Sequence, residues 1–387
     1  MPQDAILKVI AEYQGDTRAE KIDLGVGVYR DADGNTPILS TVKKAEHHLV
    51  GTQVTKSYLG SSGADAFNQL IQRLIFGDEA GQSERITTLQ TPGGSGSLRV
   101  AAGVVLRAEK DVTIWTGEPT WANHIPLIGS AGIDMKSHPY YDNETKQIRF
   151  DDMLQAVKQI PAGDILLLHG CCHNPTGMDL TEEQWRELTD VVKSGGQIPF
   201  IDIAYQGFAN GLEEDSFGVR HMFESVPEMI VSSSCSKNFA LYRDRIGSLS
   251  FVAKDAGTSA IIRSQANNIV RTMYSMPPDH GASVVSHILQ DDALRAEWED
   301  ELAGMRNRLK SMRAALGAAM REKAPDHDFS HFEKGNGMFS FVGISPEQVE
   351  TLKRDAAVYM VGSSRINVAG ITAENVDHLA SSIAAVL

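Results

Sequence analysis

The chain has 387 residues, of which 42% are hydrophobic and 22% charged, a balance typical of soluble globular proteins. Its length suffices for one large domain or for two domains that share a core. The formal net charge of -14 argues against a nucleic-acid backbone or an anionic membrane as the main partner, although a few converging arginines could still hold a small anion.

The N-terminal sequence MPQDAILKVIAEYQGD lacks the apolar core and the small-residue cleavage site of a signal peptide. No stretch of the sequence has the apolar length of a membrane span. The cysteines, Cys171, Cys172 and Cys235, are odd in number and do not form a disulfide or zinc pattern, so we expect reduced thiols packed in the core. These features predict a cytoplasmic protein with no membrane partner, no nucleic-acid partner and no metal.

Short apolar runs alternate with segments of helical periodicity from about residue 86 to residue 290. The runs are ITTLQ (86–90), DVTIWTG (111–117), DILLLHG (164–170), QIPFIDIA (197–204), EMIVSSS (228–234) and IGSLSFVA (246–253). Continuous apolar strands separated by helices predict an α/β fold with a mostly parallel sheet that is buried on both faces. In such sheets ligands bind beyond the carboxyl ends of the strands, where this chain concentrates Gly, Pro, Asn and Ser.

A long amphipathic helix is predicted from about residue 292. Its apolar residues recur at spacings of three and four, at Leu294, Trp298, Leu302, Met305, Leu309, Met312 and Leu316. We interpret this helix as leaving a first domain and entering a second, a small α+β domain on which extended N-terminal residues pack. The expected division is a large domain over residues 15–300 and a small domain formed by residues 1–14 and 301–387.

Three loops carry residues suited to binding chemistry. PGGSGS (92–97) precedes a helix and favours a phosphate cradle, although a Gly-rich tight turn would look the same. HNPTG (173–177) restricts Asn174 to an extended conformation, which an ordinary turn also explains. Asp202 ends an apolar run, where a carboxylate is costly unless it has a charged partner, and Tyr205 follows three residues later.

Lys237 stands at the end of another apolar run, in SSSCSKNFALYRDRIG (232–247). A single lysine usually lies on a solvated surface, but a lysine that is partly desolvated has a lowered pKa and can form a Schiff base. Ser234, Ser236 and Arg245 near it could bind a phosphate dianion. A lysine, a phosphate cradle and a buried acid together describe a site for pyridoxal phosphate.

The sequence resembles the class I aminotransferases, in particular the aspartate and aromatic amino acid aminotransferases, over nearly its whole length. SxSKNFxLYRDRIG resembles the lysine signature of that family. The other similar motifs, in the order of the family, are DLGVGVYRD, KSYLG, TPGGSGSLR, PTWANH, HGCCHNPTG, DIAYQGF, YSMPPDHGA, GMFSF and SRINVAG. The resemblance implies a fold-type I enzyme with a mostly parallel seven-stranded sheet flanked by helices, pyridoxal 5'-phosphate as cofactor, and a homodimer whose active sites are shared between subunits.

The resemblance also implies roles for single residues. Lys237 is similar to the Schiff-base lysine that later moves a proton between Cα and C4′, and Asp202 to the partner of the pyridine nitrogen. Tyr205 and Asn174 resemble the hydrogen-bond partners of the phenolic oxygen, and Trp121 resembles the residue that stacks on the ring. The implied phosphate anchors are Gly94, Ser95, Ser234, Ser236, Arg245 and, from the partner subunit, Tyr58. The implied substrate contacts are Arg365 for the α-carboxylate, with Gly27, Asn174 and Trp121 near it, and Arg271 of the partner subunit for a distal carboxylate.

Several positions depart from the strict aspartate enzymes of the family. Those enzymes usually carry Asn, Thr, Lys and Asn where this chain has Met276, Ser95, Arg30 and Ser57. The resemblance therefore implies transfer of the amino group between an aromatic or dicarboxylic L-amino acid (tyrosine, phenylalanine, aspartate, glutamate) and a 2-oxo acid such as 2-oxoglutarate, by a ping-pong mechanism. A strict aspartate aminotransferase is the alternative.

Two further alternatives are less favoured. A lyase or decarboxylase of the same fold is disfavoured because Arg365 would hold the carboxylate in the ring plane and leave the Cα–H bond to break. A non-catalytic cofactor-binding protein is disfavoured because every reacting residue is present. Three histidines, His124, His169 and His173, are expected to pack or to support other site residues rather than to bind a metal.

Overall fold

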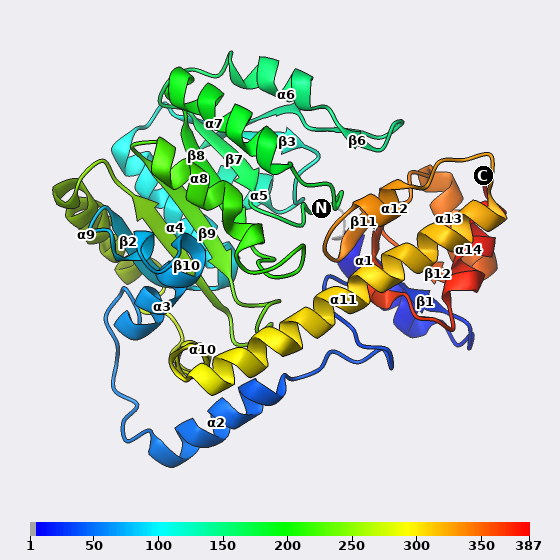
Figure 1. Ribbon diagram of the computed structural model, residues 1–387, viewed down its shortest axis with the longest axis horizontal. Coiled ribbons are helices and arrows are strands. Elements are labelled where there is room, and N and C mark those ends of the chain that lie inside the picture. The colour runs from blue at the N-terminus through cyan, green and yellow to red at the C-terminus, as the bar shows by residue number, and fades with distance from the viewer. Residues whose placement is uncertain (1–4) are drawn as a thin grey trace.

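A seven-stranded sheet forms the centre of the larger of two lobes in the computed structural model, which describes residues 5–387 (Figure 1). The strand order is β2-β10-β9-β8-β7-β3-β4. β10 runs antiparallel to both of its neighbours, and all other neighbouring pairs are parallel, as predicted. The strands are β2 (Ile86–Pro92), β3 (Thr113–Glu118), β4 (Asp134–Pro139), β7 (Ile165–His169), β8 (Ile198–Ile203), β9 (Met229–Ser234) and β10 (Ile246–Val252).

Both faces of this sheet are buried because successive residues of each strand point to opposite sides. In β7, Ile165 and Leu167 join one hydrophobic cluster, whereas Leu166 and Leu168 join another. One face is covered by α4 (Gly93–Ala108), α5 (His124–Gly129) and α9 (Ala256–Met273). The other face is covered by α3 (Asp65–Phe76), α6 (Phe150–Val157), α7 (Glu182–Gly195) and α8 (Phe217–Ser225).

The predicted long helix is α11 (Asp292–Lys323), which joins the two lobes (Figure 1). It begins at Asp291, whose side chain accepts the backbone N–H groups of Ala293 and Leu294 as an N-cap. Its first half packs on α10 (His280–Gln290) and α2 (Ser40–Thr52), and its second half packs on α12 (His331–Lys334) and α14 (Val376–Ala384).

Short strand pairs complete the smaller lobe. β11 (Phe339–Phe341) pairs antiparallel with β13 (Arg365–Asn367), and β1 (Ile22–Asp23) pairs parallel with β12 (Val358–Tyr359). The remaining elements of the chain are α13 (Pro346–Ala356), the hairpin of β5 (Tyr141–Asp142) and β6 (Gln147–Ile148), and the 3-10 turns η1 (Ala80–Gln82), η2 (Glu214–Ser216) and η3 (Val368–Gly370).

The N-terminal segment differs from the expectation that it is extended. Residues 5–15 form the helix α1 (Ala5–Gly15), and Val9 packs against Ala357, Tyr359 and Val361 of the smaller lobe. Residues 1–4 of the predicted small-domain segment lie outside the described residues. The domain limits at residues 15 and 301 remain a prediction.

The three cysteines are buried and unpaired, in agreement with the predicted core packing. The thiols of Cys171 and Cys172 and the carboxylate of Asp215 lie within 4.8 Å of one another. That carboxylate already accepts four backbone N–H groups, those of Gly207, Ala209, Asn210 and Gly211. No helix in residues 5–387 combines the length and the apolar character that a bilayer span requires.

Candidate active site

A cavity of about 240 Å³ lies where β7, β8 and β9 end and where α4 begins. It brings together most of the residues selected from the sequence, which come from loops far apart in the chain. The predicted residues that line it are Gly27, Gly94, Ser95, Trp121, Asn174, Asp202, Tyr205, Ser234, Ser236, Lys237, Arg245 and Arg365. The carboxyl edge of the sheet is therefore the place where these side chains converge.

Lys237 lies in the turn that follows β9, and its Nζ atom is 4.7 Å from the centroid of the Tyr205 ring. Burial, with a smaller contribution from the charge of Arg245, lowers the pKa of its ammonium group to about 8, although the carboxylate of Asp202 acts in the opposite direction. A lysine with such a pKa has a substantial neutral fraction near neutral pH, so it can act as a nucleophile or a base.

Asp202 is near the end of β8, with one carboxylate oxygen bonded and the other free. Its Oδ2 atom accepts a hydrogen bond from His124 Nε2 at 3.0 Å, whereas Oδ1 is buried without a protein partner. Burial acts to raise the pKa of this carboxyl, but the hydrogen bond from His124 and the nearby charges, including that of Lys237, together outweigh burial and hold the pKa below its ordinary value. A buried charged oxygen without a partner is costly, so Oδ1 is suited to a cationic hydrogen-bond donor.

His124 is itself held by a short polar chain. Its Nδ1 atom lies 2.8 Å from Thr120 Oγ1, which in turn lies 3.1 Å from His169 Nε2. Burial and the neighbouring His124 lower the pKa of His169 to about 3, so this ring is neutral. The histidines thus support Asp202, as expected from the sequence.

A set of donors suited to an anion lies beside Lys237. α4 begins at Gly93, and Gly94 and Ser95 in its first turn line the cavity. The backbone N–H groups of a first helical turn have no partner within the helix, so they are available to an anion in the cavity. Ser234 Oγ donates to Ser236 Oγ at 3.1 Å, and Arg245 Nη1 lies 3.4 Å from the same Ser236 oxygen.

The approach of Arg245 depends on a glycine. Gly93 has φ +72°, which side chains rarely tolerate, and a Cβ atom there would overlap the Arg245 guanidinium. The turn PGGSGS therefore leaves room for the Arg245 guanidinium beside the helix N-terminus.

Arg365 forms the opposite wall of the cavity, in β13. Its Nη2 atom donates to Gly25 O at 2.9 Å, and its Nε atom is buried without a partner. Its Cζ atom lies 4.6 Å from the centroid of the Phe339 ring. The guanidinium is thus fixed from one side and retains donor capacity for a planar anion such as a carboxylate.

Two predicted residues do not reach this cavity. Tyr58 is 94% exposed in the segment after α2, and Arg271 is exposed at the end of α9, where its Nη1 atom donates to Ser275 Oγ at 2.8 Å. Both were predicted to act in the site of a partner subunit.

Four lining residues were not selected from the sequence as site residues: His169, Ala204, Tyr242 and Phe339. Tyr242 and Phe339 belong to the motifs LYRDRIG and GMFSF, so the motifs gave the signal without indicating which side chain faces the cavity. Tyr242 uses its hydroxyl to accept the backbone N–H of Tyr29 at 2.9 Å, which ties the N-terminal segment to the lysine loop.

The fold is α/β, and its cavity contains a buried lysine whose pKa is lowered. A family model described as Aminotransferase class I and II matches residues 19–383, and the chain belongs to this family. It is an aminotransferase, as the sequence resemblance predicted.

Known relatives cover the whole chain. It is 44% identical over 388 residues to the aspartate aminotransferase of Haemophilus influenzae, covering 100% of this chain and 98% of that protein. The aromatic-amino-acid aminotransferase of Pseudomonas aeruginosa is also 44% identical, with 100% and 97% covered. The structure of the aromatic-amino-acid aminotransferase from Burkholderia pseudomallei, covalently bound to pyridoxal phosphate, matches with a TM-score of 0.98 at 38% identity, covering 100% of this chain and 98% of that one. The predicted fold is confirmed.

Proposed function

We propose that this aminotransferase moves the amino group between an aromatic or dicarboxylic L-amino acid and a 2-oxo acid such as 2-oxoglutarate, with pyridoxal 5'-phosphate as its cofactor. The observation that carries the proposal is the convergence in one cavity of Lys237, the free oxygen of Asp202 and the guanidinium of Arg365. An aspartate aminotransferase and an aromatic-amino-acid aminotransferase are each 44% identical in sequence to this chain, which supports both substrate classes.

The residues present fit this cofactor. Asp202 Oδ1, buried and unpaired, suits a protonated ring nitrogen, and the start of α4 with Ser234, Ser236 and Arg245 suits a phosphate dianion. When bound, pyridoxal phosphate supplies an aldehyde that condenses with an amine and a ring that accepts the electron pair left at Cα.

The side chains of this protein divide the remaining work. Lys237 moves the proton at the substrate Cα, for which a pKa near 8 suits a neutral amine. Tyr205 and Asn174, which line the cavity, would hold the phenolic oxygen of the cofactor, and Trp121 would cover the ring face. Arg365 holds the α-carboxylate, with Gly27 and Asn174 at its side, because a planar guanidinium binds a carboxylate through two parallel hydrogen bonds.

A homodimer completes each site. Tyr58 reaches the phosphate and Arg271 reaches the distal carboxylate of a substrate in the site of the other subunit. Their exposure outside the cavity of their own chain supports this arrangement, as does the exposure of Val50 near the end of α2 and of Val54 in the segment that follows. The enzyme acts in the cytoplasm on small molecules, and its net charge of -14 is unsuited to nucleic acid.

An absorbance titration tests the proposed function. The protein loaded with pyridoxal phosphate should change its spectrum when glutamate is added and should recover it when 2-oxoglutarate follows. Lys237→Ala should retain the cofactor through the phosphate contacts and still condense with glutamate, but it should not transfer the amino group to 2-oxoglutarate. A wild-type spectrum that does not respond to glutamate, aspartate, tyrosine or phenylalanine would contradict the proposal.

A further inference from the structure

Arg313 is a buried arginine in the part of α11 that enters the smaller lobe, and it has no ion-pair partner among residues 5–387. Its side chain is 1% exposed. Its guanidinium donates to main-chain carbonyls of one segment, at 3.0 Å to Gly337 O, 3.2 Å to Phe332 O and 2.8 Å to Asn336 O, and also to Phe339 O.

Such an arrangement is expensive for the fold. Burying a cation without a carboxylate costs free energy that hydrophobic packing of the same volume would not require. Burial lowers the pKa of Arg313 to about 10, which still leaves the guanidinium charged at neutral pH. Only a planar fork of donors can reach carbonyls arranged around it, so lysine would not replace this residue.

One side of the segment that Arg313 holds is bonded to a loop of the cavity. Asn336 donates its main-chain N–H to Gly177 O at 2.7 Å and its side-chain Nδ2–H to Asp179 Oδ2 at 3.1 Å. The carboxylate of Asp179 also accepts the main-chain N–H groups of residues 172 and 173, at 2.9 and 2.8 Å. Asn174, which lines the cavity, lies inside this loop.

The same loop touches the guanidinium directly. Gly177 has φ +71°, and a Cβ atom at this position would overlap both Phe339 O and Arg313 Nη2. The loop therefore lies against the hydrogen bonds between Arg313 and the segment, with no room for a side chain between them.

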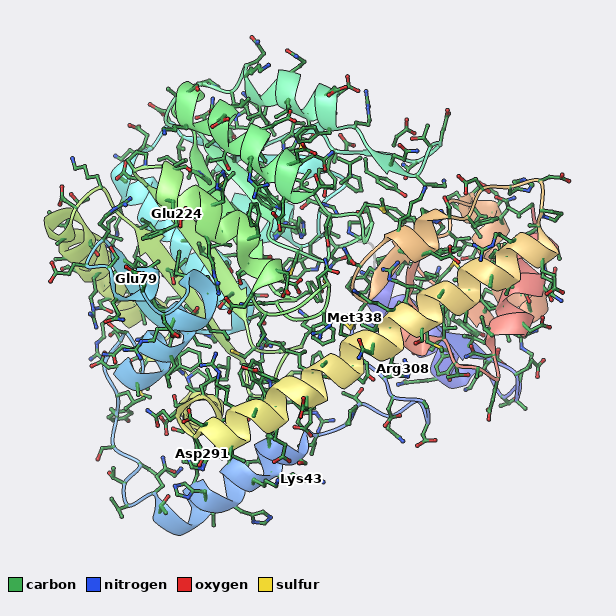
Figure 2. All side chains as sticks on the ribbon, in the orientation of Figure 1. Lys43, Glu79, Glu224, Asp291, Arg308 and Met338 are labelled. Carbon is green, nitrogen blue, oxygen red and sulfur yellow. The ribbon has the colours of Figure 1, made fainter. Side chains whose placement is uncertain are left out.

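The other side of the segment carries the substrate wall of the cavity. Phe339 begins β11 and pairs with Asn367, and Phe341 pairs with Arg365. The Phe339 ring lies beside the Arg365 guanidinium and meets the Tyr205 ring edge-on at 6.0 Å between centroids. Met338, the residue before Phe339, lies beside the middle of α11 (Figure 2).

We propose that Arg313 is a positioning residue for the substrate α-carboxylate. Its guanidinium holds the segment of residues 332–339, to which both the Asn174 loop and the Phe339–Arg365 wall are attached. The distance between these two sides of the cavity is thereby fixed. Arg313 does not line the cavity and acts only through these groups. The inference rests on the proposed function, because it presupposes that Arg365 binds a carboxylate.

Arg313→Lys tests this role, because it keeps the positive charge and removes the planar set of guanidinium N–H donors. The dissociation constant of succinate, an unreactive dicarboxylate, is measured by absorbance on the cofactor-loaded protein. Since a misplacement of about 1 Å can cost roughly 100-fold, we expect succinate to bind about 10- to 100-fold more weakly. The KM for aspartate should rise more than kcat falls.

A second readout needs no cofactor. Amide hydrogen exchange of the cofactor-free protein should become faster at Asn336, whose N–H is bonded to Gly177 O, in Arg313→Lys. The matched control is Leu316→Ala, a fully buried residue one turn further along α11, which should lower the melting temperature without changing succinate binding.

The outcomes separate the two proposals. Unchanged succinate binding in folded Arg313→Lys, or equal weakening in Leu316→Ala, overturns the positioning role. A wild-type protein that shows no response to amino acids overturns the proposed function, whatever the exchange data give. If Arg313→Lys does not fold, Asn336→Ala removes the side-chain bond to Asp179 and should weaken succinate binding in the same direction, and no change in that variant also overturns the role.

Discussion

At the scale of single residues, Lys237 combines an ordinary side chain with an unusual environment. Its pKa of about 8 arises mainly from burial. Because only the neutral amine reacts with an aldehyde, the rate of pyridoxal phosphate addition to the cofactor-free protein should rise about tenfold per pH unit below pH 8 and level off above it. Stopped-flow absorbance across this pH range measures the rate. An inflection near the ordinary lysine pKa of about 10.4 would contradict the prediction.

Arg271 is the residue on which substrate choice should depend. Its hydrogen bond to Ser275 leaves it exposed, and Met276 offers no side-chain hydrogen bond that would fix it elsewhere. We therefore expect that an aromatic substrate can enter without leaving a guanidinium buried and unpaired, which would cost several kcal/mol.

Arg271→Leu should accordingly separate the two substrate classes. Loss of a charge pair of about 3 kcal/mol predicts that kcat/KM for aspartate falls by roughly 100-fold, while that for phenylalanine stays the same or improves. Steady-state kinetics with 2-oxoglutarate as acceptor gives both values. Equal losses would exclude a mobile arginine, and negligible wild-type activity with phenylalanine would indicate a strict aspartate aminotransferase.

Site residues could be selected from the sequence where a charged side chain stands in a segment whose neighbours are apolar or small. A carboxylate at the end of an apolar run identified Asp202, and a lysine among hydroxyl residues identified Lys237. Phe339 could not be selected in this way, because a phenylalanine in a strand is ordinary and its position beside Arg365 arises only when β11 pairs with β13.

At the scale of elements, the apolar runs predicted six of the seven central strands, and β4 was missed. Its sequence DMKSHP is polar, and most of its residues are exposed or half-buried at one of the two edges of the sheet, where β3 is its only neighbour. The N-terminal helix α1 was missed because a helix of only 11 residues is marginal by itself and depends on packing against a distant strand, which the local sequence does not reveal.

At the scale of the whole molecule, the placement of Tyr58 and Arg271 outside their own cavity predicts complementation between subunits. Lys237→Ala and Arg271→Ala should each have little aspartate activity alone. After subunit exchange, a mixed dimer contains one site with both native residues, so activity should recover in part. The mixture is assayed with aspartate, with exchange verified by differently tagged chains. No recovery after verified exchange would show that Arg271 does not act across an interface.

The helix α11 also connects the two lobes through its apolar face. Trp298, near its start, stacks on Phe239 and donates to Asn238 O at 2.7 Å, directly after Lys237, whereas Leu316 and Met320 pack at its other end. These residues belong to one continuous hydrophobic cluster. Loss of either lobe would expose half of the apolar face of this amphipathic helix to water, so we expect the two lobes to unfold together.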